Sequence, residues 1–159
     1  MKFALQSQDT KTATASGTAL TFGGAGLRQI STMRSLIFTL DVASAVHSDE
    51  TYDIYVTASD GVSAWDIVHF PQIATTGAKR YTARVELDVR GENVTTASPG
   101  VAAVDSATLA TVSAGSGNGI KTLAAGSVRN GPIGETLNTE LVVAGSAPSI
   151  VYSVTVEGR

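Results

Sequence analysis

The sequence predicts an all-β fold, a β-sandwich or jelly roll of antiparallel sheets, in a single domain that spans residues 1–159. Three observations support this prediction. Apolar and polar residues alternate with a period of two, as expected for strands that place one face on a core. Turn residues interrupt these runs at short intervals, and no stretch shows a convincing helical pattern. Eight or more short strands with such punctuation are typical of two packed sheets.

The first segment, residues 1–16, is polar, rich in Thr and Ala, and weakly patterned. We interpret it as an extended arm or as an edge strand that pairs with another chain. A short strand is expected at 18–22. The glycine cluster Gly23–Gly26 that follows lacks the spacing of a dinucleotide or phosphate loop, so it is interpreted as a connection between strands.

The clearest alternation lies in residues 35–42, where every second side chain is large and apolar. Strands are also expected at 52–58 and 64–70, and the Asp60-Gly61 pair between them is a strong hairpin signal. Residues 84–90 alternate charged and aliphatic side chains. The side chains expected to share the inner face of the first of these strands are Leu36, Phe38, Leu40 and Val42.

The second half of the chain continues the pattern, with expected strands at 101–112, 120–125 and 137–143. A last strand begins at Ile150, and its inner face contains Ile150, Tyr152, Val154 and Val156. The remaining breaks between strands are expected at 76–77, 91–93, 98–100, 115–119 and 130–132.

Composition excludes several classes of site. The chain has no cysteine, so disulfides, thiolate nucleophiles and cysteine-rich metal sites are ruled out. Its net charge of −3 and the lack of a basic stripe argue against nucleic acid as a partner. No signal sequence and no membrane-spanning run is recognised, so a soluble protein made in the cytoplasm is expected. Charged residues make up only 16%, which favours a surface that partly contacts protein.

Histidine and carboxylate residues provide few candidates for chemistry. His47, Asp49 and Glu50 are conceivable metal ligands, but a solvated acidic loop is the commoner explanation. His69 is placed on the polar face of its strand. A Ser–His–Asp arrangement finds no nucleophile-elbow motif to support it. The carboxylates that a glycosidase pair would need are expected in turns or on outward positions, as solvating charges; they are Asp41, Asp53, Asp66, Glu86 and Asp88. We therefore expect no catalytic residue, no cofactor and no metal.

Trp65, the one tryptophan, is expected to pack on the neighbouring sheet or cap the end of the fold, with a sugar-stacking platform as the alternative. The glycine-rich stretch Gly115–Gly119 is interpreted as a loop. The sequon Asn93-Val94-Thr95 has no meaning without a secretory signal. The basic residues look like parts of a mixed-charge surface or subunit salt links, and they are Arg28, Arg34, Lys79, Arg80, Arg84, Arg90 and Arg129.

Strand and hairpin patterns carry a resemblance over roughly residues 35 to 156. The segments concerned are Ser35–Val42, Tyr52–Gly61, Ala64–Phe70, Gly77–Tyr81, Leu123–Gly134 and Val143–Val154. Together they resemble small virion proteins of tailed bacteriophages. The resemblance implies a non-enzymatic β-sandwich that acts as a capsid decoration, or cement, protein on the virion surface. It implies the major capsid protein and other copies of the chain, as a homotrimer, as partners.

The surfaces expected to make those contacts are the N-terminal segment and the loops near 23–34 or 113–119. Two alternatives stay open. One is a carbohydrate- or receptor-binding module that uses Trp65 and nearby tyrosines as a stacking surface. The other is a neck or tail component present in few copies. No catalytic residue is carried over from the resemblance.

Overall fold

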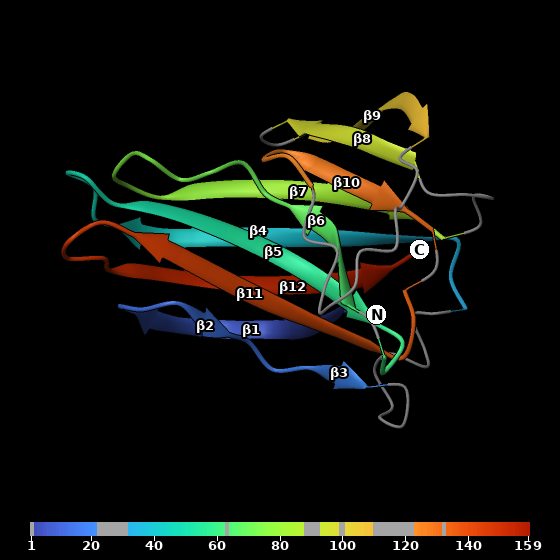
Figure 1. Ribbon diagram of the computed structural model, residues 1–159, viewed down its shortest axis with the longest axis horizontal. Helices are drawn as coiled ribbons and strands as arrows, with labels where there is room; N and C mark the ends of the chain where they lie inside the picture. The colour runs from blue at the N-terminus through green and yellow to red at the C-terminus, as the bar shows by residue number, and fades with distance from the viewer. Residues whose placement is uncertain are drawn as a thin grey trace.

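The computed structural model describes residues 2–21, 32–62, 64–87, 93–98, 101–109, 123–131 and 133–159. Within these residues the chain forms twelve β-strands and no helix, which confirms the all-β prediction. The strands form two antiparallel sheets that enclose a hydrophobic core, so the architecture is sandwich-like (Figure 1).

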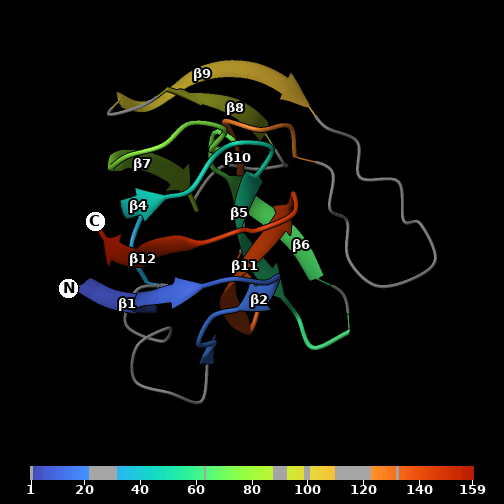
Figure 2. The same ribbon diagram turned by 90° about the vertical axis from the view of Figure 1, so that its left-hand side faces the viewer.

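One sheet has four strands and the other has eight. The four-stranded sheet has the order β1 (Lys2–Lys11), β12 (Ile150–Gly158), β4 (Ser35–Ala45) and β7 (Lys79–Glu86). The eight-stranded sheet has the order β2 (Ala15–Ser16), β11 (Thr136–Ala144), β5 (Thr51–Ser59), β6 (Ala64–His69), β10 (Ser127–Asn130), β8 (Asn93–Ser98) and β9 (Val101–Leu109), with β3 (Leu20–Thr21) also paired to β11. Figure 2 shows the two layers from one end, with β8 and β9 beyond β7 and β10.

The strand pairs are nested along the chain. β1 pairs with β12, β2 and β3 pair with β11, β4 pairs with β7, and β5 pairs with β6, all antiparallel. The strands β8, β9 and β10 come between β7 and β11 and extend one edge of the larger sheet. Because β1 pairs with β12, the first and last strands of the chain lie side by side.

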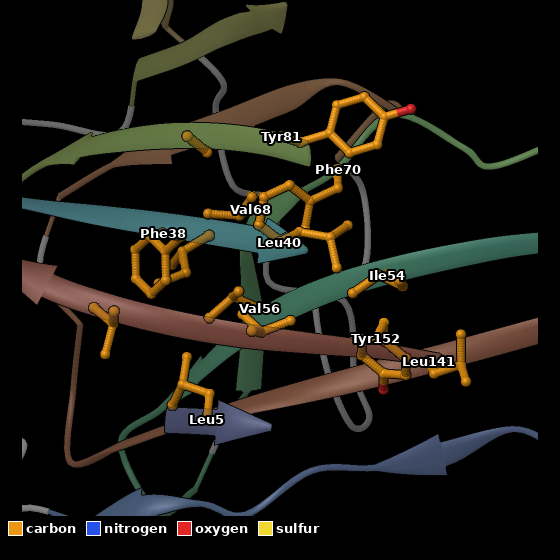
Figure 3. Packing of buried hydrophobic residues seen from close by; sticks show 14 of the residues in the cluster. Leu5, Phe38, Leu40, Ile54, Val56, Val68, Phe70, Tyr81, Leu141 and Tyr152 are labelled. Carbon is orange, nitrogen blue, oxygen red and sulfur yellow. The ribbon is translucent and has the colours of Figure 1, made fainter. Parts of the chain in front are cut away.

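The core lies between the inner faces of the two sheets (Figure 3). The alternating residues predicted for β4 and β12 supply much of it, and each of them is at most 2% exposed. Burying an aliphatic or aromatic side chain of this size stabilises the fold by about 1.5–3 kcal/mol. The largest fully buried side chains are Tyr52, Tyr152, Phe38, Phe70, Leu5, Leu36, Leu40, Ile54, Ile67 and Ile73.

Hydrogen bonds between the layers close both sides of the sandwich. On the β1 side, the amide of Gly17 donates to the Thr139 carbonyl and the amide of Thr18 donates to the Leu5 carbonyl. On the β7 side, the amide of Glu86 donates to the Asn130 side-chain oxygen, 2.9 Å away, and the Glu86 carbonyl accepts from Gly131. Asn130 therefore satisfies part of the free edge of β7.

The Asp60-Gly61 hairpin is confirmed. β5 and β6 pair on either side of it, and Gly61 has a φ of 87°, a left-handed conformation that glycine adopts at little cost. The Asp60 carboxylate accepts a hydrogen bond from the Val62 amide, and the Ser59 hydroxyl accepts one from the Gly61 amide. The turn holds Val62 at 91% exposure.

Several strand boundaries differ from the expected ones. The strand expected at 84–90 is β7, which begins at Lys79 and ends at Glu86. The strand expected at 120–125 is wrong for the described part of that range, because the strand in this region is β10, at Ser127–Asn130. All four residues of β10 are buried, so no alternation marks it in the sequence.

The N-terminal segment is an edge strand of the four-stranded sheet, which is one of the two interpretations expected from the sequence. β1 pairs with β12 of its own chain, with shifts in register between Ala4 and Gln6 and between Gln6 and Asp9. These shifts bury Leu5 and Gln6 consecutively, which breaks the period of two and explains the weak pattern. The expectation of an extended arm is wrong for these residues.

Candidate functional site

The outer face of the eight-stranded sheet gathers the polar side chains of three neighbouring strands. Ile54 and Val56 of β5 point into the core, so Asp53 and Tyr55 point outward. Tyr55 lies opposite His69 of β6 on one side and Glu140 of β11 on the other. The strand register thus brings an aromatic ring, an imidazole and carboxylates together.

His69 is the centre of this group, and both of its ring nitrogens have partners. Nε2 lies 2.9 Å from Oδ1 of Asp53, and Nδ1 lies 2.8 Å from the carbonyl oxygen of Leu123. The second oxygen of Asp53 accepts a hydrogen bond of 2.8 Å from the Gln72 amide. The Tyr55 ring stacks on the imidazole at a centroid distance of 4.0 Å and an interplanar angle of 26°. His69 is on the outward face, as expected, yet only 6% exposed.

The surrounding carboxylates act on the phenol of Tyr55. Partial burial raises the pKa of Tyr55 first, and the negative charges of Asp53, Asp66 and Glu140 raise it further. Asp66 is 0% exposed, and Arg129 on β10 is 3% exposed. The expectation that Asp66 is a solvating charge and Arg129 a surface charge is therefore wrong.

This arrangement is a hydrogen-bonded network rather than a triad. A general base needs an imidazole nitrogen free to take a proton from a nucleophile. Neither ring nitrogen of His69 is free in this way, because Nε2 faces the Asp53 carboxylate and Nδ1 faces the Leu123 carbonyl. The network can hold the Leu123 backbone and order the Tyr55 ring, which are structural tasks.

The segment His47–Glu50 has a different task from the one expected. The Glu50 carboxylate is enclosed, with the side chain 1% exposed, and it accepts hydrogen bonds from the amides of Ser48, at 2.6 Å, and Ala147, at 3.2 Å. The bond from Ser48 is the largest of the effects that lower the pKa of Glu50 to about 2, against the opposing effect of burial. Glu50 thus joins the 46–50 loop to the 145–149 loop.

Two further side chains, Tyr52 and Asp49, join the same two loops, and His47 makes a contact within the first of them. The Tyr52 hydroxyl lies 2.7 Å from the Val46 carbonyl and accepts a 2.9 Å hydrogen bond from the Ser149 amide. Asp49 accepts from the Ser146 hydroxyl at 3.1 Å, and Nδ1 of His47 lies 2.7 Å from the Glu50 carbonyl oxygen. The prediction of a solvated loop is correct for Asp49, which is exposed, and wrong for Glu50, which is buried. In the described part of the chain, no group of three His, Asp or Glu side chains could hold a metal ion.

The other carboxylates that were considered as catalytic pairs have basic neighbours. Asp41 lies 3.1 Å from Arg80, and Glu86 lies 2.6 Å from Arg84. All four side chains are partly exposed, so the expected mixed-charge surface is confirmed at these positions, where each pair contributes little to stability. Asp88 lies outside the described residues.

Trp65 is half-buried and packs against the hydrophobic core, which agrees with the structural interpretation. It lies opposite Ala58, a core residue of β5, at the end of the hairpin. A Cβ added to Gly134 would come within 3.0 Å of Cη2 of the indole, so the ring is tightly enclosed on that side. This position does not suit a free stacking platform.

Several other sequence candidates fall outside the described residues. They are the glycine clusters Gly23–Gly26 and Gly115–Gly119, the proposed contact loop at 113–119, most of the loop at 23–34, Arg28 and Arg90. The backbone of the sequon Asn93-Val94-Thr95 belongs to β8.

Sequence reasoning missed Tyr55, Gln72 and Leu123 as members of the outer-face network. The alternation of β5 already places Asp53 and Tyr55 on one face. The partners from Gln72 and Leu123 depend on loop positions that no local pattern encodes.

No protein-family model, curated protein or solved structure matches this chain. Among the residues that the structure describes, no helix is long and apolar enough to cross a membrane. Any assignment of function therefore depends on the fold, the surface and the sequence pattern.

Proposed function

We propose that this chain is a non-enzymatic virion structural protein of a tailed bacteriophage, a decoration protein that binds the assembled capsid and stabilises it. The nested strand pairing carries the proposal. When the strands are counted along the chain, with β2 and β3 as one strand and β8–β10 as an insertion, the two sheets have the orders 1-8-3-6 and 2-7-4-5. We interpret these orders as those of a jelly roll, an architecture that occurs in viral capsid and lectin domains.

The physical properties of the chain suit such a role. A decoration protein that binds only the assembled shell stabilises it by mass action, and a homotrimer multiplies weak contacts with the major capsid protein. The low charged fraction of 16% favours extensive contact with protein. β1 pairs with β12 of its own chain on one side, and this proposal assigns the shell contacts to the loops at the ends of the sheets.

Among the described residues, Val46 and Val62 are the two most exposed of the large apolar side chains. Val46 lies in the loop before β5 and is 47% exposed; Val62 lies in the turn after β5 and is 91% exposed. Because β5 is an extended strand of nine residues, these two side chains mark opposite ends of the molecule. They provide a way to find which end faces the shell.

Cosedimentation with purified expanded heads tests the proposal. The full chain should pellet with the heads at a saturating, stoichiometric ratio and should raise the temperature at which they disrupt. If the end of the molecule with Val46 faces the shell, Val46→Asp should weaken pelleting and Val62→Asp should not. If the other end faces the shell, the reverse is expected, so each variant is the matched control for the other. Lack of binding to expanded heads by the wild-type chain would contradict the proposal.

The alternative function is carbohydrate binding on the outer face of the eight-stranded sheet. Tyr55, with Asp53 and Gln72 beside it, favours this face over the Trp65 end, because Trp65 packs against the core. Titration with a glycan panel, followed by Trp65 fluorescence and by the loss of binding in Tyr55→Ala, distinguishes the two functions. The decoration role predicts no glycan binding.

A further inference from the structure

The hydrogen bonds of His69 impose a condition on its protonation state. Both groups that face the ring, the Asp53 carboxylate and the Leu123 carbonyl, are acceptors. A neutral imidazole has one N–H and can donate to only one of them, whereas the imidazolium cation donates from both nitrogens. Both contacts are therefore hydrogen bonds only when each ring nitrogen of His69 carries a proton, that is, when the imidazole is the cation.

The Leu123 carbonyl belongs to the described segment that leads into β10. Three interactions connect this segment to β6: the bond from Nδ1 of His69, the bond from the Gly126 amide to the His69 carbonyl at 2.9 Å, and the pairing of Ser127 with His69. Leu123 is 7% exposed, so its side chain is packed in this position. His69 therefore holds the entry to β10 by both its backbone and its ring.

We propose that His69 is a proton-dependent latch that holds residues 123–126 against the outer face of the eight-stranded sheet. Imidazole is the side chain that ordinarily gains or loses its proton between about pH 5 and 8. In the cationic form the ring bridges Asp53 and Leu123. The latch belongs to the chain itself and does not depend on a role in a virion.

Loss of the proton releases the carbonyl side of the bridge. The remaining N–H stays with Asp53, because a hydrogen bond to a carboxylate is stronger than one to a neutral carbonyl. The lone pair of Nδ1 then faces the lone pairs of the Leu123 oxygen at 2.8 Å, a repulsive contact. Raising the pH therefore weakens the attachment of residues 123–126, and lowering it restores the attachment.

The other charged groups near the ring set the background for this change. Asp53 on β5, Asp66 on β6 and Glu140 on β11 act on Tyr55, whose ring stacks on the imidazole. Arg129 on β10 lies two residues beyond Ser127, which pairs with His69. Carboxyl, guanidinium and phenol groups ordinarily titrate outside the range of pH 5–8. Residues 123–126 contain no titratable side chain. Of the side chains that contact residues 123–126 directly, the imidazole is the type that ordinarily changes charge in this range.

Amide hydrogen exchange measured by NMR on the full chain between pH 5 and 8 tests the latch. Protection factors, which correct for the intrinsic effect of pH, are compared for the amides of Gly126 and Ser127 and for those of β12. The protection at Gly126 and Ser127 should fall about tenfold or more as the pH rises, as expected for the loss of a hydrogen bond from a charged donor, worth about 1.5–3 kcal/mol. The protection in β12 should stay constant.

Asp53→Asn is the decisive variant, because it removes the charge but keeps the shape. The amide nitrogen of the new side chain can donate to Nε2 of a neutral His69, and its oxygen can still accept from Gln72. The neutral ring is then satisfied on both sides, so protection at Gly126 should no longer fall with pH. His47→Gln, which changes the chain's other histidine, should behave as the wild type does.

Two results would overturn the latch. One is constant protection at Gly126 and Ser127 in the wild-type chain across the range. The other is an equal fall in protection in the wild type and in Asp53→Asn. The imidazole nitrogen signals of His69 give an independent readout, since two N–H protons at pH 5 and one at pH 8 are required.

Discussion

At the residue scale, two fully buried tyrosines differ in what their hydroxyls contact. The Tyr52 hydroxyl bonds to the backbone of Val46 and Ser149, whereas the buried Tyr152 hydroxyl has no hydrogen-bond partner among the residues that the structure describes. A buried hydroxyl without a partner costs free energy, while one with good partners stabilises the fold. The two residues thus form a natural matched pair.

We predict that Tyr152→Phe leaves the free energy of unfolding unchanged or raises it by about 1 kcal/mol. Tyr52→Phe should lower it by about 1–3 kcal/mol, because its loss leaves the Ser149 amide without an acceptor. Urea unfolding of both variants measures the difference. A larger loss in Tyr152→Phe than in Tyr52→Phe would show that the assignment of partners is wrong.

Tyr152 also predicts a dependence of stability on alkaline pH. Burial, followed by the charge of Asp9, raises the pKa of Tyr152 to about 12, above its ordinary value near 10. The folded state keeps the phenolic proton where the unfolded state loses it, so this contribution is complete below pH 10 and is lost as the pH rises through 12. Tyr152→Phe should remove this part of the alkaline slope in thermal melts recorded from pH 9 to pH 12.

Glu50 predicts the opposite dependence, in acid. Its pKa, lowered to about 2, means that the folded state favours the carboxylate, so the contribution is complete above about pH 4.5 and is lost as the pH falls through 2. Glu50→Gln should lower the melting temperature at pH 7 and flatten its decline between pH 4.5 and pH 2. Asp41→Asn is the control, because Asp41 is a partly exposed carboxylate paired with Arg80 at the surface, where such a pair contributes little to stability; it should change neither value appreciably. An unchanged acid profile in Glu50→Gln would contradict the role of the carboxylate.

The sequence predicted some of these residue environments and missed others. Alternation correctly placed Leu36, Phe38 and Tyr152 in the core, because large apolar side chains identify the inner face. It could not show that Glu50 and Asp66 are buried. A charged residue is buried only when tertiary neighbours supply its hydrogen bonds or counter-charges, and those neighbours are distant in the chain.

At the scale of elements, the contact between the 46–50 and 145–149 loops depends on a glycine. Gly145 has a φ of 104°, and an added Cβ would lie 2.7 Å from Cα of Glu50. Gly77 has a similar φ of 94°, but nothing lies within 4 Å of the position of its Cβ. An alanine at position 77 therefore adds backbone strain alone, whereas an alanine at position 145 adds the same strain and a steric clash.

We predict that Gly77→Ala costs about 1 kcal/mol of stability, through backbone strain alone. Gly145→Ala should cost clearly more, because the backbone of Glu50 must also move. Denaturant unfolding of the two variants tests this comparison, and equal losses would mean that the loops are not in close contact.

Elements differ in how visible they are in a sequence. The β5–β6 hairpin was predictable because alternating strands flank an Asp-Gly pair. β1 was expected only as one of two alternatives, because its register shifts interrupt alternation. β10 was missed because the polar residues on its outward face are buried as fully as the side chains on its inner face. Local pattern fails where the tertiary structure bends or covers a strand.

At the scale of the whole molecule, the nested order of strands joins the two ends of the chain. Alternation predicts that strands exist, but the pairing of β1 with β12 and of β4 with β7 connects residues that no local signal relates. The outer-face network around His69 has the same origin, since Asp53, His69 and Leu123 meet only after the larger sheet has formed. Topology and site were therefore beyond the reach of the sequence pattern.

The function proposed for the whole molecule rests on this topology and on the resemblance to small phage virion proteins. The jelly roll proposed for this chain also occurs in carbohydrate-binding domains, so the proposed fold alone does not decide between a shell-binding and a sugar-binding role. What separates these roles is the number of copies that one virion holds.

Quantitative mass spectrometry of purified virions of the encoding phage is the most direct test of the decoration role. The proposal predicts a copy number comparable to that of the major capsid protein, because a decoration protein occupies equivalent positions over the whole shell. A handful of copies per virion would place the chain in the neck, tail or fibre, and its absence from virions would contradict the proposal altogether.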